Sequence, residues 1–137
     1  MIYQKNKVCS IYIDMSFLTD ERKEVLNKFV QFVKEQLELK SVPTIKVQNN
    51  RDGLKTTANY DYTKENKIIK VCAKNRALVD VCRSIAHEMV HHKQFEQGRL
   101  KVQPPDIGGE IEDEANAKAG QFIKMYAKED PNIYNED

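Results

Sequence analysis

Two histidines four residues apart, with a glutamate beside the first, form the most chemically distinctive segment of the sequence, His87-Glu88-Met89-Val90-His91. On an α-helix the two imidazoles project from one face a turn apart, so both rings can reach a single metal ion. Zinc binds neutral imidazole nitrogens at about 2.0–2.1 Å. Glu88 leaves the helix about 100° around from His87, where its carboxylate can act as a general base on water at the metal. The segment predicts a hydrolytic zinc site with one Zn²⁺ per chain.

The third protein ligand must come from elsewhere in the chain. The only other histidine, His92, follows His91 directly, and its side chain leaves the helix about 100° away. Cys82 lies on roughly the opposite side of the helix from His87, where we expect a core residue. A carboxylate is therefore the expected third ligand. The nearest dense source of carboxylates is the acidic run Glu110, Glu112, Asp113 and Glu114.

Taken together, the two segments resemble the gluzincins, zinc peptidases whose third ligand is a glutamate. Their second motif is typically Glu-x-x-x-Asp, and Glu112-x-x-x-Asn116 is similar to it. The resemblance implies that Glu112 is the ligand, with the other acids of the run as alternatives, and that Ala115 is a small packing residue. It also implies that Asn116 orients a ligand histidine, because asparagine keeps the hydrogen-bond acceptor although it lacks the charge. The motif further resembles the repressor-cleaving metallopeptidases of phages and bacteria, in which asparagine is usual.

Helical and strand periodicities place these motifs in an α+β domain. Apolar residues recur at helical spacing after Thr19, a suitable N-cap, which predicts a helix over 20–39. Further helices are expected over 77–97, which carries the histidine pair, and over 110–128, which carries Glu112. The β-prone segments expected to form a small mixed sheet are 8–13, 45–48, 55–62 and 67–73, the last two as a hairpin.

These elements predict a single domain over residues 1–137, with an acidic tail from about 130 to 137 that we expect to be mobile. The resemblance implies a minimal zincin-like fold: a small mixed sheet, an N-terminal helix, an active-site helix and a C-terminal glutamate helix. In such folds an edge strand before the active-site helix binds extended peptide by main-chain pairing, and residues 57–62 would be that strand. Tyr60 and Tyr62 are its candidate substrate-binding residues, although tyrosines in strands more often pack.

Composition limits the partners and the compartment. The formal net charge of +1 gives no electrostatic reason to expect nucleic acid or an acidic membrane surface. No apolar run approaches the roughly 20 residues of a membrane helix, and residues 1–7 lack the apolar stretch of a secretory signal. Three cysteines without a Cys-x-x-Cys pair favour reduced thiols in the cytoplasm, which would be a host cytoplasm if the protein is viral.

The sequence thus predicts a zinc metallopeptidase that acts on a peptide or protein substrate, with Glu88 as general base. Two alternatives stay open. The domain could cleave a non-peptide amide, as a phage-associated cell-wall hydrolase would, or it could be a metal-stabilised binding or regulatory module without turnover. The sequence does not favour any particular oligomeric state.

Overall fold

The computed structural model describes the backbone of residues 11–13 and residues 18–41, 43–52, 54, 56–63, 67–100 and 109–134 in full. The predicted strand residues 8–10 and the tail residues 135–137 lie outside this part. The elements in chain order are β1 (Ile11–Ile13), α1 (Asp20–Leu37), β2 (Thr44–Gln48), β3 (Ala58–Asp61), β4 (Ile68–Cys72), α2 (Leu78–Glu96), α3 (Gly109–Glu129) and the 3₁₀ turn η2 (Pro131–Tyr134). Within the described residues, no helix has the length and apolarity needed to cross a membrane.

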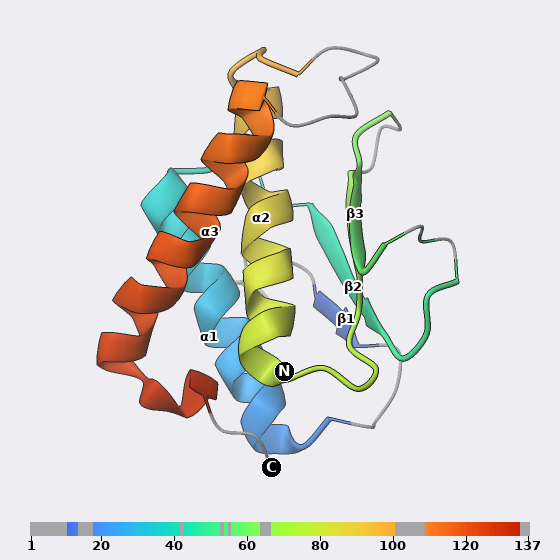
Figure 1. The fold of residues 1–137 in the computed structure, drawn as a ribbon, viewed down its shortest axis with the longest axis vertical. Helices are drawn as coiled ribbons and strands as arrows, with labels where there is room; N and C mark the ends of the chain where they lie inside the picture. The colour runs from blue at the N-terminus through green and yellow to red at the C-terminus, as the bar shows by residue number, and fades with distance from the viewer. Residues whose placement is uncertain are drawn as a thin grey trace.

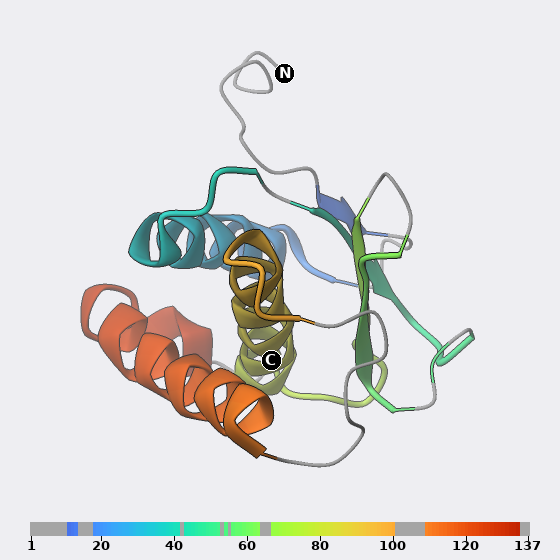
Figure 2. The same cartoon turned by 90° about the horizontal axis from the view of Figure 1, so that it is seen from above.

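The sheet has four strands in the order β1-β2-β4-β3, and the helices lie together on one side of it (Figures 1 and 2). Strands β1, β2 and β4 run parallel to one another, and β3 pairs antiparallel with β4 at the edge of the sheet. The register aligns Ile45 with Ile69 and Ile69 with Tyr60, and all three side chains are buried. The fold is the small α+β arrangement predicted, with the expected hairpin supplying the edge strand.

Helix α1 begins where the sequence predicts. The Thr19 hydroxyl accepts a hydrogen bond from the Arg22 amide at 3.2 Å, and Asp20 and Glu21 occupy the first turn, where the helix dipole favours acids. The helix ends at Leu37, because Glu38 adopts a left-handed conformation with a φ of 54°. Its buried face carries Val25, Leu26, Phe29, Val30, Val33 and Leu37.

Helix α2 lies at the centre of the molecule, between the sheet on one side and α1 and α3 on the other (Figure 2). Ile85 and Met89 are completely buried in the common core, which gives the helix a fixed place relative to both layers. The helix is followed by Gly98, whose φ of 74° suits a glycine after a helix C-terminus. Helix α3 packs along α2, so its first turn lies beside the second half of α2 (Figure 1).

The end of the chain differs from the prediction. A mobile tail was expected from about residue 130, but Pro131–Tyr134 form the turn η2 and Ile133 is completely buried. Asp130 accepts hydrogen bonds from the Tyr126 hydroxyl at 2.9 Å and from the Asn132 amide at 3.2 Å. Burial of Ile133 and these two bonds thus hold part of a segment whose polar composition had suggested mobility.

Candidate metal centre

The two histidines of α2 and a glutamate of α3 converge on one point. Nε2 of His87 lies 3.2 Å from Nε2 of His91. The Glu112 carboxylate contacts both rings, with Oε1 at 3.1 Å from Nε2 of His87 and Oε2 at 3.0 Å from Nε2 of His91. Among the described residues, these three form the group of ligand-type side chains whose donor atoms lie close enough together to hold a metal ion.

The donor set has the composition and spacing of a zinc site. Two imidazole nitrogens and a carboxylate oxygen are ligands that zinc accepts, and zinc binds them at about 2.0–2.2 Å in a tetrahedral arrangement. Neighbouring ligands of such a tetrahedron are about 3.3 Å apart, close to the separations between His87, His91 and Glu112. These residues therefore fit a divalent cation, with one coordination position left for water or substrate.

The centre is open to solvent on its α3 side. The side chain of Glu112 keeps 38% of its surface exposed, whereas those of His87 and His91 keep 19% and 11%. Burial lowers the pKa of His87, and the neighbouring His91 lowers it further, although Glu112 and Asn116 act in the opposite direction. The neutral imidazole that metal binding needs is thus favoured near neutral pH.

Glu88 lies beside the cluster without belonging to it. Its side chain is nearly buried, and burial together with the charge of Glu112 raises its pKa to about 8. A carboxyl with a pKa in this range can accept and release a proton near neutral pH. Burial and the negative charge of Glu112 thus make the Glu88 carboxyl harder to ionise than a surface glutamate.

Asn116 stands one helical turn after Glu112 on α3, and its side chain forms a hydrogen bond with the His87 ring that raises the pKa of that ring. A partner of this kind fixes the orientation of a ligand ring. Asn116 thus joins the α3 turn that carries Glu112 to one of the two histidines of α2.

The sequence interpretation did not include Gln94, which the structure places against the other histidine. Its Oε1 lies 2.7 Å from Nδ1 of His91, and its Nε2 donates to the Ile111 carbonyl at 3.1 Å and to Oε1 of Glu114 at 2.7 Å.

Glu114 also pairs with Arg99 at 2.9 Å. Hydrogen bonds from Gln94 and Arg99 lower the pKa of Glu114 despite a smaller opposing effect of burial. Glu114 is thus engaged away from the histidine pair. The only signal in the sequence was a glutamine one turn after His91.

The two tyrosines of the edge strand are not brought to the metal cluster. The hydroxyl of Tyr60 lies 2.6 Å from Nδ1 of His92, in a buried contact between β3 and α2. Tyr62 stacks on Tyr60 and packs against Phe95, with ring centres 5.5 and 5.6 Å apart. Both rings therefore pack between β3 and α2 in this structure, and their positions give no support to the substrate-binding role considered for them.

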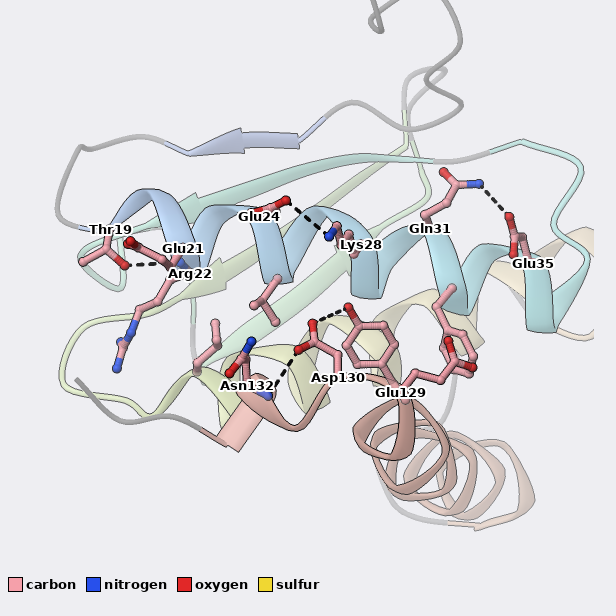
Figure 3. A pocket seen from close by; sticks show the side chains of 14 residues that line it. Thr19, Glu21, Arg22, Glu24, Lys28, Gln31, Glu35, Glu129, Asp130 and Asn132 are labelled. Carbon is pink, nitrogen blue, oxygen red and sulfur yellow. Dashed lines mark hydrogen bonds and ion pairs between the residues drawn. The ribbon is translucent and has the colours of Figure 1, made fainter.

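A cleft of about 830 Å³ lies elsewhere, between α1 and the segment that joins α3 to η2 (Figure 3). The charged side chains of Glu21, Glu24 and Glu129 line it, and Leu78 and Tyr126 contribute apolar surface. None of the residues that line it belongs to the histidine–glutamate cluster. The candidate metal centre is thus separate from this cleft.

Comparison with known proteins adds no relative to these observations, because no protein-family model, no curated protein and no solved structure matches the chain.

Proposed function

We propose that this protein is a zinc-dependent metallopeptidase that hydrolyses peptide bonds in a peptide or protein substrate. The observation that carries the proposal is the convergence of His87, His91 and Glu112, with Glu88 next to the first ligand on α2. Within the described residues the cluster supplies three protein ligands. Structural zinc sites usually have four, whereas catalytic sites keep one position for water or substrate.

The roles of the chain's own residues follow from their positions. Zinc bound there would act as a Lewis acid on the scissile carbonyl and lower the pKa of a coordinated water. Glu88 takes a proton from the attacking water and passes it to the leaving amine. Asn116 and Gln94 hold the rings of His87 and His91 in their orientations. Strand β3, at the edge of the sheet formed by the described strands, would offer backbone groups to an extended peptide.

The state of the cysteines supports the cytoplasm as the compartment. Cys72 and Cys82 are both buried free thiols. Burial raises the pKa of the Cys82 thiol, so this residue is an inert core group rather than a reactive or metal-binding one. Thiols kept in this state are typical of a reducing compartment.

Metal content and turnover, measured on the same purified chain, test the proposal. We expect about one zinc per chain in the wild type, and no bound zinc in His87→Ala. Glu88→Gln should keep its zinc but cleave a labelled unfolded protein at least about 100-fold more slowly, since a general base contributes roughly 10²–10⁴-fold. The matched control is Glu24→Gln on α1, where the carboxylate forms an exposed ion pair with Lys28 at 3.2 Å.

Two results would contradict the peptidase proposal. One is full activity of Glu88→Gln, because the general base would then lie elsewhere. The other is a zinc-bound wild type that cleaves neither the unfolded protein nor short peptides. Cleavage of peptidoglycan fragments in its place would identify a cell-wall amide hydrolase, and no turnover on any of these would identify a metal-stabilised binding module.

A further inference from the structure

Gln94 is a completely buried polar residue between the two helices that carry the candidate ligands. Both ends of its amide are hydrogen-bonded, the oxygen toward His91 on α2 and the nitrogen toward Ile111 and Glu114 on α3. A buried amide that left either end unpaired would cost about 1–3 kcal/mol. Full pairing on both sides fixes the position of this side chain between the two helices.

The partners of Gln94 determine which end of the amide faces which helix. The Ile111 carbonyl and the Glu114 carboxylate are both acceptors, so the group that contacts them at 3.1 and 2.7 Å must be the NH₂. Rotating the amide by 180° would place its oxygen against these two oxygens. Arg99 holds the same Oε1 of Glu114 at 2.9 Å and so keeps that acceptor in place. The amide oxygen must therefore face His91.

The orientation of the amide in turn determines the proton position on the His91 ring. An amide oxygen only accepts, so Nδ1 of His91, 2.7 Å away, must carry the hydrogen. In the neutral ring Nε2 is then the unprotonated nitrogen. This is the atom that lies 3.0 Å from Glu112 and 3.2 Å from Nε2 of His87. The lone pair of His91 is thereby directed at the point where the other two ligands converge.

We propose that Gln94 is a positioning residue that prepares the centre before the ion binds. It selects the Nδ1–H tautomer of His91, and through the Ile111 carbonyl it holds the α3 turn in which the next residue, Glu112, is a ligand. The chain Arg99–Glu114–Gln94–His91 thus extends from an exposed arginine to a metal ligand. This inference rests on the proposed metal site. Loss of such a partner typically weakens metal binding 10–100-fold.

The tautomer itself is measurable without any metal. Long-range ¹H–¹⁵N correlation spectra of the chelator-treated wild type, recorded at about pH 8.5, above the histidine range, should assign His91 to the Nδ1–H form. An Nε2–H ring, or an even mixture of the two forms, would overturn the proposal. Because the spectrum needs no variant and no ion, it is informative even if the chain neither binds zinc nor cleaves any substrate.

Variants of Gln94 separate its two functions. Gln94→Leu removes both, and we expect a mixed His91 tautomer and zinc binding 10–100-fold weaker in a competition titration. Gln94→Glu keeps an acceptor for Nδ1–H, so the His91 tautomer should stay as in the wild type. The bonds to Ile111 and Glu114 are both lost, and the new carboxylate faces that of Glu114, so zinc binding should still weaken. The matched control is Gln31→Leu on α1, whose side chain donates a hydrogen bond to the Glu35 carboxylate at 3.3 Å, away from the metal centre.

Wild-type zinc affinity in a folded Gln94→Leu protein would contradict the inference while leaving the peptidase proposal intact. A wild type that binds no zinc would instead contradict the peptidase proposal, and the spectrum of the metal-free protein would still decide the tautomer.

Discussion

The hydroxyl of Tyr60 lies 2.6 Å from Nδ1 of His92, and this bond joins the edge strand β3 to the helix that carries the metal ligands. Nε2 of His92 lies 3.0 Å from the Ser41 carbonyl, which can only accept, so this nitrogen carries the ring hydrogen. Nδ1 then accepts from Tyr60. His92 therefore has the opposite tautomer to the one we propose for its neighbour His91. The unprotonated nitrogen of His92 is Nδ1, which faces Tyr60 of the sheet, whereas that of His91 is Nε2, which faces the metal centre.

Replacing Tyr60 by phenylalanine tests the link between strand and helix. The change removes one hydroxyl and leaves Nδ1 of a nearly fully buried histidine without a donor. We expect the free energy of unfolding of Tyr60→Phe, measured with urea, to be about 1–3 kcal/mol lower than that of the wild type. For the proposed peptidase activity, KM should rise more than kcat falls, because the edge strand loses its bond to α2 while Glu88 is unchanged.

The control for this experiment is Tyr134→Phe, since Tyr134 is 52% exposed. The free energy of unfolding of this variant should lie within about 0.5 kcal/mol of the wild-type value. Equal stability of Tyr60→Phe and the wild type would show that the 2.6 Å contact contributes nothing net to the fold.

Zinc should stabilise the folded chain only while Glu112 is present. A ligand that binds the folded state at about 100 times its Kd adds about 2.7 kcal/mol to the free energy of unfolding. We expect this gain in the wild type and in Glu110→Gln, whose side chain is exposed on the first turn of α3, but not in Glu112→Gln. Thermal unfolding with zinc and with a chelator measures it. If Glu110→Gln lost this stabilisation and Glu112→Gln kept it, the third ligand would be Glu110 and not Glu112.

Much of the fold was predictable because its signals are local. Thr19 and the apolar spacing after it define α1, and the spacing of His87 and His91 on α2 places two donors on one face whatever the rest of the chain does. The strand segments were also recognisable. Their parallel pairing, with β4 between β2 and β3, depends on contacts between residues far apart in sequence, and strand periodicity contains no information about neighbours.

The residues that support the site were harder to predict for a related reason. The scarcity of histidine pointed to a carboxylate in the run Glu110–Glu114, and the motif resemblance favoured Glu112 within it. Gln94, in contrast, has its proposed function only because Ile111 and Glu114 lie opposite it. His92 was excluded as a ligand by its direction, yet nothing local indicated that Tyr60 would be its partner. A single isoleucine in a polar tail likewise gave no periodic signal for η2.

The contribution of Glu96 to stability should depend on pH. Burial raises the pKa of this carboxyl, but hydrogen bonds from the Lys40 and Ser41 amides, the charge of His92 and the Ser41 hydroxyl lower it below the usual 4.5 on balance. A carboxyl whose pKa is lower in the folded state stabilises the fold above the unfolded pKa, and this stabilisation is lost as the pH falls through the folded value.

We therefore expect Glu96→Gln to be less stable than the wild type by about 1–3 kcal/mol at pH 7, where two backbone amides lose an ionised acceptor. The difference should shrink below pH 4.5, where Glu96 of the wild type becomes protonated. Urea unfolding at a series of pH values measures both curves. A difference that stays constant from pH 7 to pH 3 would show that the ionised form of Glu96 has no special stability.

We expect the turn η2, near the end of the chain, to contribute to the stability of the core. Ile133 is completely buried, and its turn contacts α1, α2 and α3, so truncation of its side chain leaves a cavity beneath the three helices. We expect Ile133→Ala to lower the free energy of unfolding by about 2–5 kcal/mol, and the adjacent Tyr134→Ala, at an exposed position, by less than about 0.5 kcal/mol. Equal effects of the two substitutions would mean that the segment after Asp130 does not pack on the helices in solution. Asp130 accepts a hydrogen bond from the Tyr126 hydroxyl near the end of α3. In Ile133→Ala, amide hydrogen exchange should therefore become faster first in the last turn of α3. The first turn, which carries Glu112, should keep its protection and its zinc.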